Sequence, residues 1–345
     1  MELPGAVRPA GGQLYWNATG TERPATRRSF LADGPAARHA ASVMREEETS
    51  VAGGVLEAAR GPAPGAWVDG LVGITIFSAS LVATRLALTG MDALFLSAAR
   101  AALAGLAGAA ALLALRQARP CRADLPALAI VAAGVVVGFP LLTALALRTV
   151  GAAHGTVFLG LLPLATALFG ALRSGERPSP VFWLLSLAGA LVTVGFAARG
   201  LDGPPGPGDA FMLVAILLCG LGYAEGGVLA RRLGGWQVIA WATVLSLPVS
   251  LPLALALRPA EPAAIPMAAW AGLAYVALFS MLIGFVFWYR ALARGGIAAV
   301  GQLQLLQPFL GLGVAALILG ERIEPAMIGA ALAVAVCVAL ARRFA

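Results

Sequence analysis

Apolar runs of about 20 residues recur from Val68 to the C-terminus, and each is long enough to cross a bilayer as a helix. A soluble protein is about one quarter charged, whereas this chain of 345 residues is 12% charged and 60% hydrophobic. The runs follow one another so closely that no soluble catalytic domain fits after Val68. The sequence therefore predicts a membrane protein that crosses the bilayer many times.

We predict an all-α polytopic membrane protein with ten transmembrane helices, because a helix satisfies its own backbone hydrogen bonds inside lipid. Ala and Leu dominate the runs, and apolar and polar residues do not alternate as they would in the strands of a membrane barrel. The predicted spans are Val68–Leu88, Ala93–Leu115, Leu125–Leu147, Gly151–Leu172, Pro180–Ala198, Ala210–Ala230, Trp236–Leu257, Met267–Tyr289, Gly296–Ile318 and Pro325–Ala341.

The arginines between the spans predict the orientation, since basic loops tend to stay on the cytoplasmic side. If the first span enters from the cytoplasm, eleven loop arginines lie inside and four lie outside. The lysine-free composition, rich in Ala, Gly and Leu, is typical of a GC-rich bacterial genome. We therefore expect a protein of the bacterial inner (plasma) membrane with both termini in the cytoplasm.

Residues 1–65 differ from the rest of the chain. They are rich in Ala, Pro and Gly, carry seven arginines and seven acids, and show no apolar periodicity. This composition predicts a disordered N-terminal tail. Met44 lies shortly before the first span, and one hypothesis is that the natural chain begins there.

The most specific feature is a self-similarity at an offset of 145 residues. Gly175-Glu176-Arg177 recurs as Gly320-Glu321-Arg322, and we expect these turns to shape tight loops, with the glutamate capping a helix end. A Pro- and Gly-rich linker at 200–208 separates 66–199 from 209–343, which we predict to be two five-helix repeats. Since five is odd, the second repeat enters the membrane inverted, as in many secondary transporters.

Two prolines occupy matched positions in this repeat. Pro163 and Pro308 lie in the middle of the fourth and ninth predicted spans. Each removes a backbone hydrogen bond, so we expect a helix break at both. Paired interruptions point to a binding site at the repeat interface; the alternative is that both prolines are merely tolerated.

Over residues 66 to 343 the chain resembles the drug/metabolite transporter superfamily, EamA type. The resemblance depends on the ten-span plan, and on a mid-span proline followed by a Gly-Glu-Arg turn in each half. Gly222-Tyr223-Ala224-Glu225-Gly226, leading to Arg231-Arg232, looks like the family's sixth span. The resemblance implies a permease for amino acids, other metabolites or drugs, and it does not specify which.

Glu225 is the acid that lies well inside a predicted span, and a charge in hydrocarbon is a functional candidate by default. One interpretation is a carboxylate that couples transport to protons or binds a cation. The other is a structural acid that pairs with a helix end or reaches the cytoplasmic interface.

Amides and hydroxyls supply further candidates. Gln304 and Gln307 are three residues apart and share a helix face. We predict that both face the cavity and bind substrate, the alternative being hydrogen bonds between helices. Ser80 in the first span, with Ser78 and Thr84, is a weaker candidate of the same kind.

Arg100 lies inside the second predicted span. It is a candidate for binding a carboxylate or phosphate of the substrate. The alternative is that it pairs with backbone carbonyls or reaches the outer interface.

These observations favour a secondary transporter that moves a small metabolite, an amino acid or a drug-like solute, by alternating access, with export as the expected direction. The chain has no Walker A motif and no cluster of catalytic groups, which argues against an ATPase and against an enzyme. A lipid-carrier flippase or a non-transporting assembly partner is the alternative. The Cys and His residues form no ligand pattern, so we expect neither metal nor cofactor. The expected partners are a small-molecule substrate and membrane lipids, and a homodimer stays open.

Overall fold

The computed structural model describes residues 64–149, 158–197, 206–319 and 325–345. The predicted tail, apart from Pro64 and Gly65, lies outside the described residues. So do residues 200–205 of the linker and the second Gly-Glu-Arg turn. The described residues belong to one compact unit that spans Gly61–Ala345, and they form helices and loops without a strand.

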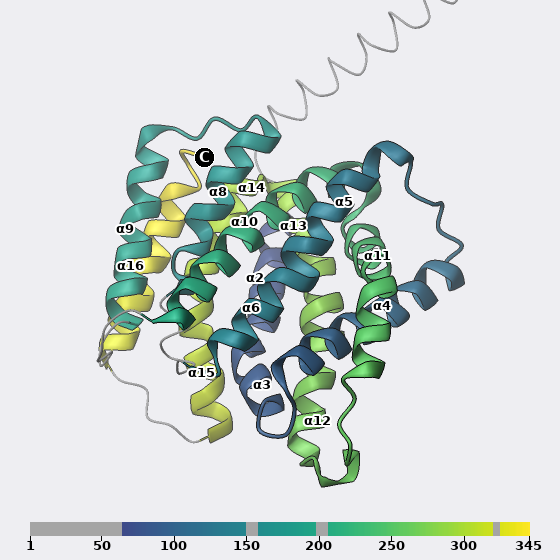
Figure 1. Ribbon diagram of the computed structural model, residues 1–345. Helices are drawn as coiled ribbons and strands as arrows, with labels where there is room; N and C mark the ends of the chain where they lie inside the picture. Colours follow the sequence, from purple (N-terminus) through teal and green to yellow (C-terminus); the bar gives the residue numbers. More distant parts are fainter. Residues whose placement is uncertain (1–63, 150–157, 198–205, 320–324) are drawn as a thin grey trace, which may run out of the picture. The chain divides into compact units, whose positions relative to one another are not determined.

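Helices follow one another along this unit (Figure 1). Those before residue 200 are α2 (Pro64–Ser78), α3 (Ser80–Ala87), α4 (Ala93–Ala114), the short 3₁₀ helix η1 (Arg122–Asp124), α5 (Leu125–Val131), the π-helix η2 (Ala132–Gly138), α6 (Phe139–Ala146), α8 (Leu162–Ser174) and α9 (Pro180–Ala197). Those after residue 206 are α10 (Pro207–Leu233), α11 (Gly235–Ala256), the 3₁₀ helix η3 (Pro262–Ala264), α12 (Met267–Ala274), the π-helix η4 (Tyr275–Ile283), α13 (Gly284–Gly295), α14 (Ile297–Gly301), the 3₁₀ helix η5 (Gln302–Leu306), α15 (Gln307–Leu319) and α16 (Pro325–Ala341).

Six helical stretches in the described part are long and apolar enough to cross a membrane: Gly65–Ala87, Ala93–Ala114, Arg122–Ala146, Pro207–Leu233, Gly235–Ala256 and Met267–Gly295. They coincide with the first three predicted spans and with spans six to eight. The fifth and tenth predicted spans correspond to the shorter apolar helices α9 and α16. The fourth and ninth are interrupted close to Pro163 and Pro308.

Large apolar side chains are exposed on the outer surfaces of the bundle. Leu113 is 78% exposed, Leu172 69% and Val249 69%. A soluble protein rarely exposes so much apolar surface, whereas hydrocarbon solvates it. The exposed residues therefore support a polytopic membrane protein.

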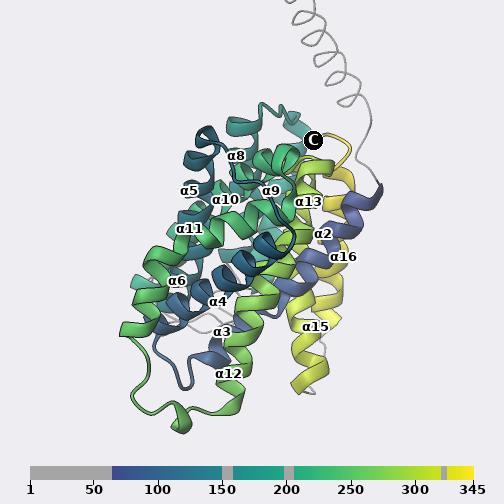
Figure 2. The same cartoon turned by 90° about the vertical axis from the view of Figure 1, so that its right-hand side faces the viewer.

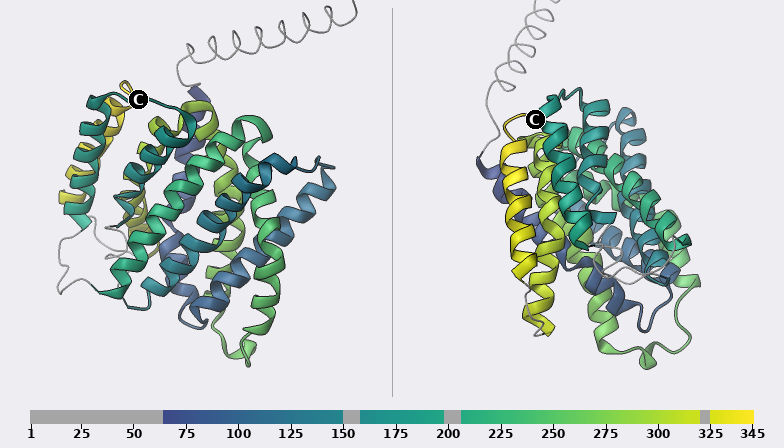
Figure 3. Two further views of the ribbon diagram at one scale, coloured as in Figure 1. Left: turned by 45° about the horizontal axis from the view of Figure 1, so that its top comes forward. Right: turned by 90° about the vertical axis from the view of Figure 1, so that its left-hand side faces the viewer.

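Helices from the two halves pack against each other in a reciprocal pattern. The first predicted span lies beside the eighth, since α2 packs on α13 and α3 on α12. The sixth lies beside the third, since α10 packs on α5, η2 and α6. Exchanging the halves turns one of these pairings into the other. The second and seventh spans also pair (α4 with α11, Figure 2), as do the fifth and tenth (α9 with α16, Figure 3).

Both the third and the eighth predicted spans contain a π-helical segment. In the third, η2 ends two residues before Pro140, which has no backbone N–H to donate to the preceding turn. A Cβ on Gly134 in η2 would lie 2.4 Å from the carbonyl oxygen of Leu218, so a glycine is needed where η2 meets α10. Such π segments in helices are frequent at functional sites.

A break between α2 and α3 divides the first span. Thr75 and Ser78 donate side-chain hydrogen bonds to the carbonyls of Leu71 (2.7 Å) and Ile74 (2.6 Å). Bonds of this kind compete with the helix ladder and often bend it. The helix is interrupted at Ala79, and α3 begins at Ser80.

Candidate functional site

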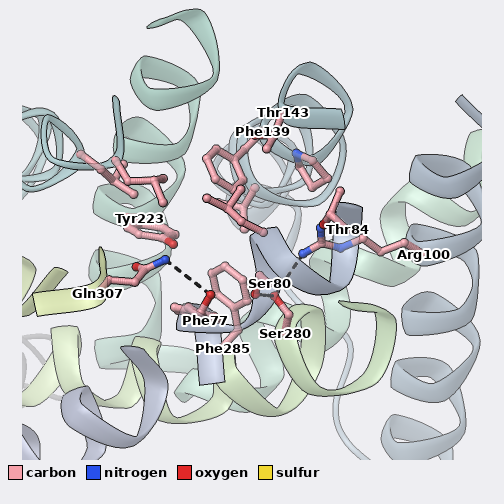
Figure 4. Close-up of a pocket in the computed structure, with 15 residues that line it drawn as sticks. Phe77, Ser80, Thr84, Arg100, Phe139, Thr143, Tyr223, Ser280, Phe285 and Gln307 are labelled. Carbon is pink, nitrogen blue, oxygen red and sulfur yellow. Dashed lines mark hydrogen bonds between the residues drawn. The ribbon is translucent and has the colours of Figure 1, made fainter. Parts of the chain in front are cut away.

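A small cavity lies where helices from both halves meet (Figure 4). Its volume is about 40 Å³, which is room for a few water molecules. We call it the central pocket. Its lining residues are Phe77, Ser80, Leu81, Thr84, Arg100, Val135, Phe139, Pro140, Thr143, Leu159, Leu162, Tyr223, Ser280, Phe285 and Gln307.

Arg100 brings a charge into the central pocket from α4. Its side chain is buried, with 7% of the residue exposed. Its Nη2 donates a hydrogen bond to the Ser280 Oγ at 3.2 Å, and its buried Nε has no partner among the described residues. The described part of the chain shows no ion pair to Arg100, and no acid lines the pocket there. The structure thus places Arg100 in the wall of the pocket, with a serine hydroxyl as its hydrogen-bond partner.

Ser80 and Ser280 join Arg100 in a short chain of hydrogen bonds. The Ser80 hydroxyl donates to the Ser280 Oγ at 2.8 Å, so Ser280 accepts from both neighbours. Ser80 is the first residue of α3, after the helix break, and Ser280 lies in the π-helix η4. Both serines line the pocket from irregular parts of their helices. Figure 4 shows their side chains beside the guanidinium of Arg100.

Gln307 lines the pocket, and Gln304 does not. The Gln307 Nε2 donates to the carbonyl of Phe77 at 3.5 Å, a long hydrogen bond. Gln304 is 1% exposed, and both polar atoms of its amide are without a partner in the described part of the chain. Of the two glutamines expected on one cavity face, the structure brings only Gln307 to the central pocket.

The helix path changes at both matched prolines. A turn at residues 160 and 161 precedes α8, and Pro163 lies in the first turn of that helix. Pro308 is the second residue of α15, directly after the 3₁₀ segment η5. The neighbouring residues Leu162 and Gln307 line the pocket, so both irregular segments border it.

Aromatic rings form the apolar part of the pocket. The Phe77 and Phe285 ring centroids lie 4.9 Å apart, and those of Tyr223 and Phe285 lie 5.7 Å apart. Phe139 adds a ring from α6. The pocket thus combines one cation and several hydroxyl groups with an aromatic wall.

Glu225 lies outside the lining of the pocket, two residues beyond Tyr223 on α10. It is buried, with 4% of the residue exposed, and forms an ion pair with Arg173 at the end of α8. Glu225 therefore sits in a contact between the two halves, and Arg100 is the buried charge of the pocket.

Three further acids, Asp69, Asp124 and Glu176, pair with arginines at the same end of the bundle as Glu225. Asp69 accepts from the Arg290 Nε at 2.6 Å, and Asp124 pairs with Arg232. Arg290 lies close to the junction of α10 and α11, because a Cβ on Gly235, the first residue of α11, would lie 2.7 Å from the backbone nitrogen of Arg290.

The fourth pair completes this end. Glu176 accepts from the Arg231 Nη2 at 2.7 Å, and its two oxygens accept from the backbone N–H groups of Ile297 (2.9 Å) and Ala298 (2.8 Å). The expected capping role of this glutamate is therefore confirmed. Each of the four pairs joins a residue before position 200 to one after it. We call the region that holds them the ion-paired end.

Both ends of the described unit lie near one another. The Arg342 guanidinium lies 5.3 Å from the centroid of the Trp67 ring, and the Phe344 carbonyl accepts from the Ser179 N–H at 2.9 Å. Trp67 is two residues from Asp69, so these contacts are at the ion-paired end. The other end of the bundle holds an ion pair between Asp92 and Arg148 at 3.4 Å, both before residue 200.

Sequence reasoning missed Ser280, Thr143 and the aromatic wall. Ser280 lies in an uninterrupted apolar run, and a lone hydroxyl there carries no signal of its own. Tyr223 belongs to the Gly222–Gly226 segment that carried the family resemblance, and this signal could have identified it.

Comparisons with known proteins identify the family of the chain. The family model described as the EamA-like transporter family matches residues 67–197 and 206–342. The uncharacterized transporter YdeK of Bacillus subtilis (strain 168) is 60% identical over 279 residues, 81% of this chain and 97% of that protein. A probable terminal-alkyne amino-acid exporter of Streptantibioticus cattleyicolor is 29% identical over 278 residues, 78% of this chain and 91% of that protein.

A solved structure, described only as the crystal structure of a protein, has the same fold. Its TM-score is 0.63 at 23% identity, and the alignment covers 81% of this chain and 99% of that chain.

Proposed function

Because the chain belongs to the EamA-like transporter family, we propose that it is a secondary transporter that moves a small metabolite across the bacterial plasma membrane, with the central pocket as its substrate site. The observation that carries the proposal is Arg100. Buried polar and ionisable groups are expensive in a membrane and mark substrate pathways. This arginine lies where the two halves of the chain meet.

Ten spans in two inverted repeats, 66–199 and 209–343, are part of the proposal. One family model matches two successive stretches of the chain. The exchange of helix pairings between the halves, and the π-helices in the third and eighth spans, are what such a repeat would produce. Both ends of the described unit at one end of the bundle are consistent with an even number of crossings.

The ion-paired end supports alternating access. Among the described residues, each of the four acids of this end pairs with an arginine of the other half, and Arg294 also lies 3.9 Å from Asp69. This end therefore opens only if these pairs separate. The corresponding positions of the other repeat, 145 residues away from Asp69 and Arg290, are Val214 and Leu145. Since those residues are apolar, the opposite end lacks this counterpart. We propose that the ion-paired end faces the cytoplasm and is closed in this conformation.

Glu225 gives a route for proton coupling. A proton on its carboxylate removes the charge that attracts Arg173, and the contact between α8 and α10 weakens. We propose that protonation of Glu225 favours opening of the ion-paired end, and that Pro163 and Pro308 mark the segments that bend.

Gln304 stays in the proposed site although it does not line the pocket here. Its amide is buried with unmet hydrogen bonds, and it lies in the 3₁₀ segment η5 one turn before Gln307. Mid-helix 3₁₀ segments often mark hinges. We propose that Gln304 reaches the substrate when η5 changes its winding.

The substrate is proposed to be an amino acid or a related metabolite, and the direction export, because one relative is named as a probable amino-acid exporter. The test is counterflow in proteoliposomes that contain the full-length protein. Labelled amino acids, monocarboxylates, nucleosides, sugars and cationic drugs would be tried in turn. Saturable counterflow that falls in Ser280→Ala and Gln307→Ala is expected.

The matched control is Leu113→Ala, which changes an exposed apolar residue far from the pocket lining. It should transport like the wild type. If none of these solutes shows counterflow, or if the two pocket variants leave it unchanged, the proposed site is wrong.

A further inference from the structure

We infer that the central pocket binds its substrate through a carboxylate, prefers an apolar body to one that carries an ammonium group, and discriminates against organic cations. This inference rests on the proposed function and narrows its substrate class. It excludes cationic drugs and places zwitterionic amino acids behind monocarboxylates of the same shape.

Arg100 brings an unbalanced positive charge to the central pocket. Arg100 is buried, and the described residues supply no carboxylate to balance it. An ion taken out of water without a partner is strongly disfavoured. A ligand with one negative charge would neutralise the pocket, whereas a cation would add a second positive charge to it.

Two buried polar groups of the pocket have unmet hydrogen bonds. The Arg100 Nε and the Thr143 Oγ1 are both buried without a partner in the described part of the chain, and both residues line the pocket. A guanidinium presents its N–H groups as a fork that matches the two oxygens of a carboxylate. The Thr143 hydroxyl is a further donor for such an anion.

The orientation of the guanidinium is held from the other side. Its Nη2 donates to Ser280, which also accepts from Ser80. These serines act as positioning residues, because they hold Arg100 at the edge of the pocket (Figure 4).

The wall of the pocket decides which body the carboxylate can carry. Phe77, Phe139, Tyr223 and Phe285 offer aromatic surface, and no acid of the described part lines the pocket beside them. An ammonium group of an amino acid would lose its water there without gaining a counter-ion. An apolar chain or ring would lose nothing comparable. At about 40 Å³ the cavity must widen to admit such a body.

A matched set of ligands tests the inference. The four probes share a phenyl ring on a short chain: 3-phenylpropanoate, phenylalanine, 3-phenylpropanamide and 2-phenylethylamine. Affinities would be measured by calorimetry on the full-length protein in lipid nanodiscs. We expect 3-phenylpropanoate to bind at least tenfold more tightly than the amide and the amine, with phenylalanine between them.

Variants then assign the preference to residues. Arg100→Gln should remove the difference between 3-phenylpropanoate and its amide. Thr143→Val keeps the shape and the charge of the pocket, and should weaken only the acid, by several-fold. Arg85→Gln is the matched control, since Arg85 is an exposed arginine of α3 outside the lining, and it should retain the full preference.

Other outcomes would overturn the inference without touching the transporter proposal. Equal or tighter binding of the amine or the amide to the wild type is one, and acid selectivity that survives Arg100→Gln is another. Chloride or phosphate that binds but is not displaced by 3-phenylpropanoate would make the pocket an inorganic-anion site. If no probe binds, the carboxylate class is wrong, and the counterflow screen decides separately whether the chain transports anything.

Discussion

Replacing Arg100 with methionine should make the ligand-free protein more stable while abolishing carboxylate binding. Methionine has a long, unbranched side chain that adapts to irregular space, so it fills most of the volume of the arginine without its charge. A residue kept for structure loses stability on such a change. A residue kept for a ligand at the expense of stability gains it.

The magnitude can be worked out from the surroundings of the side chain. Its hydrogen bond to Ser280, at 3.2 Å, is a charged one whose loss costs about 1.5–3 kcal/mol. Removing a buried, uncompensated charge returns several kcal/mol of desolvation free energy, and replacing even a paired set of buried charges by apolar residues is often neutral or stabilising by roughly 1–4 kcal/mol. We therefore expect the Arg100→Met protein to be more stable by about 1–3 kcal/mol.

The assay is thermal unfolding of wild type, Arg100→Met and the control Arg85→Met in one detergent, with and without 3-phenylpropanoate. Without ligand, Arg100→Met should unfold at the highest temperature, and Arg85→Met should match the wild type. With ligand, the wild type should rise and Arg100→Met should not. If Arg100→Met unfolds several degrees below the wild type while Arg85→Met does not, Arg100 has a structural counter-ion. The inference that its charge is unpaired in the ligand-free protein would then be wrong.

Three further predictions concern other contacts. Asp69→Asn removes the carboxylate that pairs with Arg290 and Arg294 and should shift the protein by up to about fivefold toward the conformation open at the ion-paired end, since such a pair contributes roughly 1 kcal/mol or less. Labelling of a cysteine introduced beside Arg290 measures the shift, and unchanged labelling would count against the gate. Gly226→Ala puts a Cβ against the ring of the fully buried Tyr289. This overpacking should lower the free energy of unfolding, measured by chemical denaturation, by about 1–3 kcal/mol. An unchanged free energy of unfolding would show that the ring moves aside freely. Glu176→Gln keeps one acceptor for the start of α14 but loses the charge, and denaturation should reveal a loss of about 1 kcal/mol. No loss would mean that water caps the helix equally well.

The candidate site could be predicted from the sequence only in part. Arg100 and Ser80 were identifiable because a charge or a hydroxyl in an apolar run is visible residue by residue, and both line the pocket. Gln304 and Gln307 were expected together from regular helix geometry, yet only Gln307 lines the pocket. Ser280 gave no signal, because its role depends on two partners 180 and 200 residues away.

Glu225 shows the limit of reasoning from one position. A buried acid in a membrane span is a functional candidate by its chemistry alone. Whether it faces a substrate or another helix depends on what lies across from it, and that neighbour, Arg173, is 52 residues away in the sequence.

The amino-acid sequence by itself indicated three properties of this protein. Local hydropathy indicated a membrane environment, the need for backbone hydrogen bonds in lipid indicated helices, and the repeated motifs indicated the family. Tertiary structure alone decided which buried polar groups share a cavity and which pair with one another. The physical reason is that hydrophobic length is a property of one segment. The free energy of a buried charge depends on the distances to groups that only packing brings near, as it brings Ser280 to Arg100 and Arg173 to Glu225.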